Sequence, residues 1–133
     1  MSLDALRFSA AGSEAGVAFD DGAEAGGDAT TWVRATGPTD AERERLAGAY
    51  GIHQLEFEDV GPDVRPKVET SETHTFVVVK SARLRAGETT FEEEIRDVAL
   101  GLFVGEDWLV TLSAEPLEAV DAVWERVLTE EPR

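Results

Sequence analysis

Two adjacent carboxylates, Glu58 and Asp59, stand just before a Gly61-Pro62 turn in the stretch LEFEDVGPDVRPKVE. Carboxylates at the end of a short helix, beside a turn, can offer oxygen ligands to a hard divalent cation. Magnesium usually takes only one or two protein carboxylates and keeps several waters, so a complete protein cage is not required. Neighbouring acids also occur on ordinary solvated turns. The pair alone is therefore compatible with a cation site and with a solvated turn.

The excess of acidic residues is the strongest signal in the composition. The 133-residue chain has 28 acidic and 12 basic residues, which gives a formal net charge of -16. Such a field attracts cations and repels nucleic acid, so we expect no nucleic-acid partner. Because the acids are spread along the whole chain, most of them favour a surface adapted to high salt. A cation site must therefore be argued from particular residues.

Sequence templates for enzymes and nucleotide sites are missing. The chain has no cysteine, which excludes disulfides and thiolate zinc sites. It contains no G-x-G-x-x-G, no P-loop and no serine in a nucleophile-elbow pattern. We expect His53 to make a structural hydrogen bond at a helix junction and His74 to lie on a strand edge. We therefore predict that the chain is not an enzyme.

The elements that must position the acidic pair begin with a segment rich in glycine and alanine. Alternating apolar residues predict short strands at residues 5–10 and 16–20, with a loop over residues 22–29. The stretch TTWVRAT, residues 30–36, predicts a stronger strand because aromatic and β-branched residues occupy its centre.

After residue 36 the spacing of the apolar residues changes to one that is typical of helices. Thr39 as N-cap, Glu42 three residues later and Gly51 as a stop predict a helix over residues 40–50. A second, short helix is expected in the stretch HQLEFEDV, with Leu55 turned toward the core.

The second half of the chain predicts strands followed by a helix. Residues 73–85 predict a long strand buried on both faces, and the segments around Gly105–Asp107 predict a hairpin. The segment after Pro116 places an apolar stripe on one side of a helix. The stripe consists of Leu117, Val120, Val123, Trp124 and Val127. Strands mixed with helices that can cover both faces predict an α/β fold, a mixed β-sheet sandwiched between helices.

No membrane segment is expected within the chain. No run approaches the roughly 18 apolar residues of a membrane helix, and no secretory signal is visible at the N-terminus. The amphipathic helix leads straight into the last residues, so we expect a soluble single domain over residues 1–133 that is truncated from a longer protein.

Several stretches taken together resemble the N-terminal cytosolic domain of CorA-type magnesium transporters. In chain order they are Trp32-Val33, GIHQLEFEDV, RPKVE, FVVVK and EPLEAVDAVWERV. Their order and spacing match over residues 31–127, and the combination of GIH..L..ED with RPKVE is the most specific part. The resemblance implies a CorA soluble-domain-like α/β/α sandwich at the cytoplasmic face of the cell membrane. It also implies a homopentameric channel whose stalk and membrane segments are not in this chain.

The resemblance also implies roles for the acidic pair. In the family, an acid of the ED pair lies at the subunit interface and binds regulatory magnesium together with a carboxylate of a neighbouring subunit. Asp59 occupies that position and Glu58 lies beside it. The implied function is sensing of Mg2+, or of Co2+, that gates the channel. We expect weak binding by the isolated chain, which would hold half of a site.

The chain departs from the family pattern at two places near this site. Gln54 stands where the family usually has proline, and the turn over residues 60–64 is one residue shorter and lacks the usual His-Gln. The shorter turn leaves open whether a second metal position exists.

Three alternatives remain at this stage. The first is the soluble domain of a zinc-exporting member of the same superfamily, which shares the fold. The second is an acidic interaction domain with no metal role. The third is a carboxylate-dependent hydrolase, for which no converging pair of acids is visible.

Overall fold

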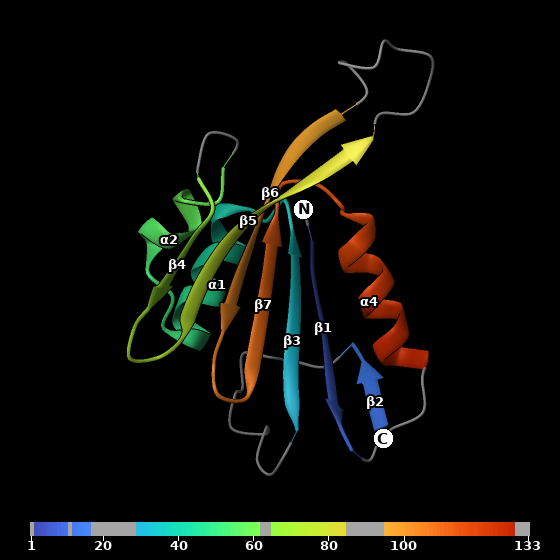
Figure 1. Ribbon diagram of the computed structural model, residues 1–133. Coiled ribbons are helices and arrows are strands. Elements are labelled where there is room, and N and C mark those ends of the chain that lie inside the picture. The colour runs from blue at the N-terminus through green and yellow to red at the C-terminus, as the bar shows by residue number, and fades with distance from the viewer. Residues whose placement is uncertain (1, 11, 17–28, 62–64, 85–94, 130–133) are drawn as a thin grey trace.

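The computed structural model describes residues 2–10, 12–16, 29–61, 65–84 and 95–129. These residues form a mixed seven-stranded sheet with helices on both faces, as predicted (Figure 1). The strands are β1 (Ser2–Ser9), β2 (Gly12–Ala15), β3 (Thr30–Thr36), β4 (Lys67–Thr70), β5 (Thr75–Leu84), β6 (Ile95–Val104) and β7 (Trp108–Ser113). The helices are α1 (Asp40–Tyr50), α2 (Gln54–Glu58) and α4 (Glu118–Thr129). The strand order is β2-β1-β3-β7-β6-β5-β4, and β3–β7 is the parallel pair among otherwise antiparallel neighbours.

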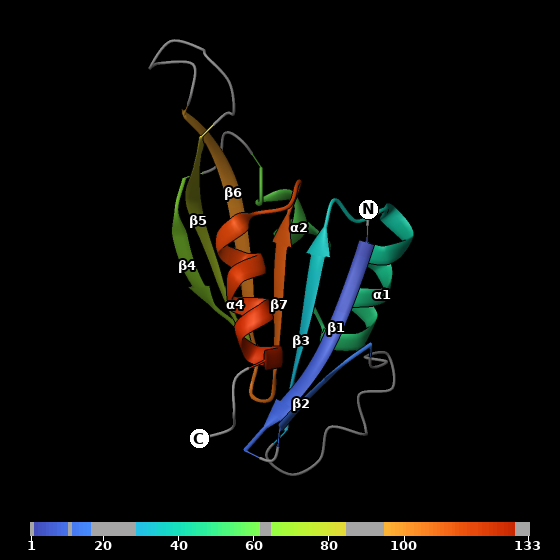
Figure 2. The same ribbon diagram turned by 90° about the vertical axis from the view of Figure 1, so that its right-hand side faces the viewer.

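The sheet separates two hydrophobic cores. Figure 2 shows α4 on one side of the sheet and α1 on the other. The larger core joins α1 and α2 to the sheet through Leu46, Phe57 and the fully buried Phe76 and Phe103. The smaller core lies under α4, where the Trp32 and Trp124 rings meet edge-on, with centroids 4.9 Å apart.

Helix α1 begins and ends where the sequence predicts. Thr39 and Glu42 form the expected capping box, since each side chain accepts a hydrogen bond from the other residue's backbone N–H. Gly51 ends the helix in the left-handed conformation at φ 71°, which a residue with a Cβ adopts only with strain. This glycine turns the chain directly into α2.

The second strand that the structure describes was not predicted from the sequence. This strand, β2, comprises Gly12–Ala15 and pairs with β1 in the register Leu6↔Ala15. Gly16 has a positive φ of 73° and ends the strand. Residues 17–28, which include most of the strand predicted at residues 16–20 and most of the predicted loop, lie outside the described residues.

Over residues 75–80, where the structure describes its side chains, strand β5 is buried on one face only, which corrects the expectation of a strand buried on both faces. Phe76 and Val78 are fully buried against α1 and α2, whereas Val77 and Val79 are half-buried. Helix α4 lies over the β1 and β2 side of the sheet, and no described helix covers β4 to β6 on that face (Figure 1).

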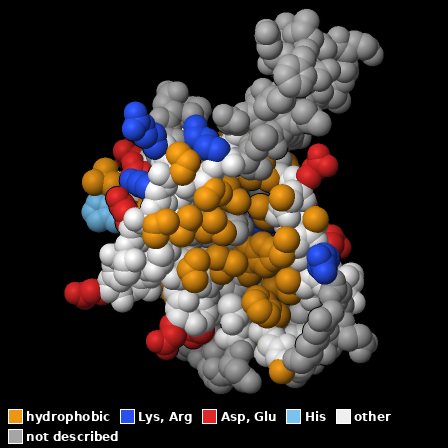
Figure 3. All heavy atoms as spheres, in the orientation of Figure 1, with side chains coloured by type: hydrophobic (Ala, Val, Ile, Leu, Met, Phe, Trp, Pro, Cys, Tyr) orange, Lys and Arg blue, Asp and Glu red, His pale blue; other side chains and the backbone are white. Residues whose placement is uncertain are grey.

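An apolar strip therefore remains on the α4 face of the sheet. It consists of Val68, Val77, Val79, Leu100 and Leu102, which the strand registers place side by side. Val68 is 67% exposed and the others are half-buried. Figure 3 shows hydrophobic side chains gathered on this face of the molecule.

The remaining elements agree with the sequence except at one residue of the last helix. Strands β6 and β7 form the predicted antiparallel hairpin. In α4, Trp124 is buried and Val120 and Val127 pack on the same core, but Val123 is 51% exposed at the edge of the stripe. Within the described ranges, no helix combines the length and hydropathy needed to cross a bilayer.

Candidate functional site

Helix α2, which ends at Glu58, is fixed at its start by a second capping box. The His53 Nδ1 accepts a hydrogen bond from the Leu55 N–H at 3.0 Å, and the Glu56 carboxylate accepts one from the His53 N–H at 2.9 Å. His53 therefore has the structural hydrogen-bonding role expected from the sequence. A helix of five residues needs such caps because most of its backbone groups have no partner within the helix.

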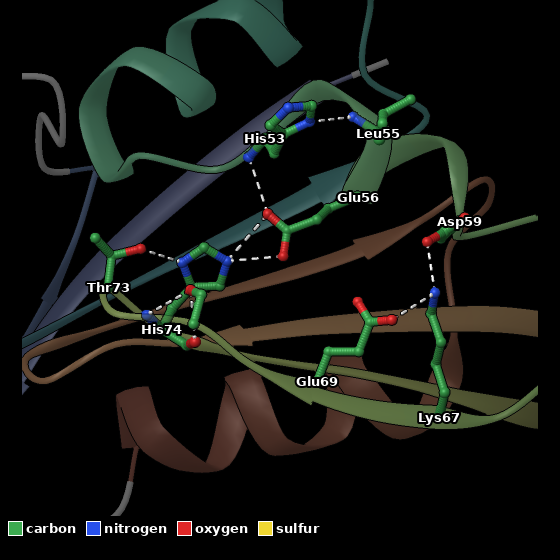
Figure 4. Close-up of polar contacts among 9 residues, drawn as sticks. His53, Leu55, Glu56, Asp59, Lys67, Glu69, Thr73 and His74 are labelled. Atoms are coloured by element: carbon green, nitrogen blue, oxygen red, sulfur yellow. Dashed lines mark hydrogen bonds and ion pairs between the residues drawn. The ribbon is translucent and has the colours of Figure 1, made fainter.

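The same carboxylate binds a buried histidine of the sheet. Glu56 holds the Nε2 of His74 at 3.0 and 3.1 Å through its two oxygens, and the Nδ1 lies 2.7 Å from the Thr73 hydroxyl (Figure 4). The His74 side chain is 2% exposed and contacts the rings of Trp108 and Phe103. The prediction that His74 is a strand-edge residue is therefore wrong. His74 precedes β5, lies beneath α2 and ties that helix to the sheet.

Phe57, rather than Leu55, is the core residue of α2. Phe57 is 3% exposed and its ring lies 5.7 Å from that of Phe103, whereas Leu55 is 60% exposed. Residues two positions apart in a helix differ by about 200° around its axis, so Leu55 and Phe57 cannot both face the core. The larger apolar side chain takes the inward position.

Asp59 caps the C-terminus of α2 and pairs with a base from β4. The Lys67 Nζ lies 2.5 Å from Asp59 Oδ2 and 3.3 Å from Glu69 Oε2 (Figure 4). The Asp59 side chain is 41% exposed, so one side of the carboxylate remains open to solvent. The hydrogen bond to Asp59 raises the pKa of Lys67 above its ordinary value of 10.5, although desolvation opposes this and Glu69 adds to it.

Strand β4 presents Lys67 and Glu69 on one face. Lys67 and Glu69 are two residues apart, so their side chains leave the strand on the same side. That side faces α2, because Lys67 lies opposite the fully buried Val78 and its Nζ lies 5.7 Å from the Phe76 ring centroid.

The site as a whole is an open acidic hollow between α2 and the start of β5. Its lining includes Glu56, Asp59, Glu69, Glu72 and His74. Among the residues that the structure describes, no group of three or more histidine or acidic side chains is arranged to hold a metal ion.

One of the two predicted ligands lines the hollow. Asp59 and Glu69 line it and both pair with Lys67, whereas Glu58 is exposed and does not line it. Sequence reasoning missed Lys67 and Glu69 as neighbours of Asp59. Their spacing of two in a strand was the available signal, because it puts both side chains on one face.

Comparison with known proteins gives a consistent result. The chain matches the family described as "CorA-like Mg2+ transporter protein" over residues 27–133. The cobalt/magnesium transport protein CorA of Methanocaldococcus jannaschii is 25% identical over 104 residues, which are 77% of this chain and 30% of that transporter. The chain thus spans less than a third of this relative.

Two solved structures share the fold. The soluble domain of CorA from Methanocaldococcus jannaschii superposes with a TM-score of 0.71 at 20% identity, over 97% of this chain and 48% of that one. The ZntB cytoplasmic domain from Vibrio parahaemolyticus superposes with a TM-score of 0.68 at 8% identity, over 96% of this chain and 50% of that one. At these identities the likeness shows the fold alone.

Proposed function

Since the chain belongs to the CorA-like Mg2+ transporter family, we propose that it is the cytosolic divalent-cation-sensing domain of a magnesium transport protein. The family match over residues 27–133 carries this proposal, and it includes the whole segment from α2 to β5 around Asp59. The role is a binding role and not an enzymatic one.

Asp59 is the ligand that we propose for the regulatory cation. It is a half-exposed carboxylate, so a second protein surface can approach it. Mg2+ takes oxygen ligands, usually one or two carboxylates with several waters, and Asp59 alone supplies part of such a set. Glu58 is exposed beside it and would contribute from the solvent side. Co2+ is a second candidate cation for the same oxygens.

The proposed mechanism is a shift between two arrangements of neighbouring subunits. A cation shared by Asp59 and a carboxylate of another subunit would offset the repulsion between chains that each carry a net charge of -16. Because the cation would bind only the closed arrangement well, it would favour a closed ring, which we expect to be a homopentamer. Without the cation, the repulsion between subunits would return and the ring would loosen.

Sensing would take place at the cytoplasmic face of the cell membrane. The relative named above is a transport protein of which this chain matches 30%. We propose that the membrane-crossing part of this protein corresponds to the unmatched remainder.

The second candidate is the soluble domain of a zinc-exporting member of the same superfamily, which would share this fold. The residues at the site favour magnesium, because zinc sites are usually built from thiolate and imidazole ligands. This chain has no cysteine, and the imidazole of His74 is buried against Glu56. An acidic interaction domain without a metal role is the remaining alternative.

Titration calorimetry with MgCl2 at fixed high ionic strength tests the proposal. We expect weak binding to the isolated chain, with a dissociation constant of about 1 mM, and a clear loss of affinity in Asp59→Asn. Asp107→Asn, at the exposed β6–β7 turn, makes the same charge change and should bind like the wild type.

Two results would contradict this assignment. Binding that is unchanged in Asp59→Asn would mean diffuse attraction to the acidic surface. Micromolar binding would mean a complete site within one chain. Parallel titration with ZnCl2 separates the two cation candidates. If the chain is the domain of a zinc exporter, Zn2+ should bind more tightly than Mg2+ in an Asp59-dependent manner.

A further inference from the structure

We propose that Lys67 is a tethered competitor for the cation at Asp59. Its ammonium group occupies one oxygen of the Asp59 carboxylate, Oδ2, and a divalent cation must displace it in order to use that oxygen. This inference rests on the cation-sensing role proposed above and adds a residue that sets the affinity of the site.

The first observation is that one of the two Asp59 carboxylate oxygens is already engaged. The Lys67 Nζ lies 2.5 Å from Asp59 Oδ2, which is at the short end for a charge-assisted hydrogen bond. A cation that coordinates this oxygen cannot share that position with an ammonium group, because both groups are positive and would be in contact.

The second observation is that the ammonium group is held in place by the fold. Lys67 is the first residue of β4, and its Nζ lies 5.7 Å from the centroid of the buried Phe76 ring. A group tethered in this way has a high effective concentration at its partner. A cation from solution therefore competes with a neighbour that never diffuses away.

The third observation is that Lys67 has a second partner to move to. Glu69 Oε2 lies 3.3 Å from the same Nζ, on the same face of β4. When a cation takes Asp59, Lys67 keeps this carboxylate and its charge stays paired. Displacement therefore does not leave an unpaired ammonium group beside the core, and the exchange is reversible.

Two of the other bases that the structure describes have acidic partners of their own. Arg34 pairs with Asp4 and Asp121, and Arg43 pairs with Asp40 within α1. Arg65 lies two residues before Lys67 and is exposed. Arg65→Met therefore removes the same charge at nearly the same point of the chain while leaving the Lys67–Asp59 pair intact.

The test is a magnesium titration of Lys67→Met, which keeps an unbranched side chain over Phe76 and removes the ammonium group. We expect the dissociation constant for MgCl2, at ionic strength held constant with KCl, to fall about three- to tenfold relative to the wild type. Arg65→Met should change it by less than about twofold. In an Asp59→Asn background, Lys67→Met should give no tightening.

A second measurement needs no substitution of Lys67. The chain has only two lysines, Lys67 and Lys80, so the ammonium 15N signals can be assigned and Lys80 serves as an internal reference. Addition of MgCl2 to the wild type should move the Lys67 signal toward its position in Asp59→Asn. A Lys67 signal that stays fixed while Asp59-dependent binding saturates would overturn the proposal.

The outcomes also separate this inference from the sensing role. Asp59-dependent binding without tightening in Lys67→Met overturns the competitor role and leaves the sensor intact. Equal tightening of Mg2+ binding in Lys67→Met and Arg65→Met would show a general effect of charge on affinity. This result overturns the competitor role as well. Binding that does not depend on Asp59 in any variant removes the sensor and the competitor together.

Discussion

Val60 packs directly on Gly101, so that the residue after Asp59 rests on the backbone of β6. A Cβ added at Gly101 would lie 2.5 Å from the Val60 Cγ2, which is closer than real side-chain contacts allow. The close approach seats the end of α2 on the sheet. It thereby fixes the position of Asp59 relative to Lys67.

Gly101→Ala should lift the end of α2 and destabilise the fold. Overpacking of this kind costs about 1–3 kcal/mol of unfolding free energy, which urea denaturation measures. The double variant Gly101→Ala/Val60→Ala should recover most of the loss, because it removes the two clashing methyl groups. If the double variant is as unstable as the sum of the single ones, the contact is not the cause.

Glu56→Gln should loosen α2 without removing it. The amide has one accepting oxygen where the carboxylate has two, and it carries no charge, so it holds His53 and His74 less strongly. Hydrogen bonds to a charged partner contribute about 1.5–3 kcal/mol. We expect a loss of about 2 kcal/mol in the unfolding free energy. Glu58→Gln makes the same charge change at an exposed position and should stay within about 0.5 kcal/mol of the wild type.

The Lys67–Asp59 ion pair predicts a pH dependence at alkaline pH. Because the folded state raises the pKa of Lys67, the pair contributes fully to stability below the ordinary pKa of 10.5. That contribution is lost as pH rises through the higher pKa of the folded state. The difference in unfolding free energy between wild type and Lys67→Met should therefore be constant through neutral pH and shrink above 10.5. A difference that grows with alkaline pH would contradict the sign.

Salt should stabilise the fold strongly. At a net charge of -16 the folded chain repels itself, and the Debye length falls from about 10 Å at 0.1 M salt to about 3 Å at 1 M. The melting temperature should therefore rise from low to molar KCl. A flat melting temperature would contradict the interpretation of the acids as an adaptation to high salt.

The parts of the fold that local signals determine were predictable from the sequence. Helix α1 carries its own capping box and glycine stop, and β3 has its β-branched and aromatic centre. The parts that long-range contacts determine were not. Whether Leu55 or Phe57 faces the core depends on how α2 meets β6, and the burial of His74 depends on Glu56 lying above it.

The candidate site shows the same division. The ED pair and its turn identify Asp59 from the sequence, with the help of the family resemblance. The identity of its partner requires the distance between α2 and β4, which no local pattern encodes. Glu58 could not be separated from Asp59 in the sequence because adjacent acids look alike until the end of the helix is positioned.

The apolar strip on the α4 face gives salt two opposing effects on this chain. Screening relieves the repulsion within each folded molecule. It equally relieves the repulsion between molecules, so the apolar strips of two molecules, each with its exposed Val68, can then associate. Thermal stability and colloidal solubility should therefore change in opposite directions as KCl is added. The conditions that protect the fold best are those in which the isolated chain precipitates most readily.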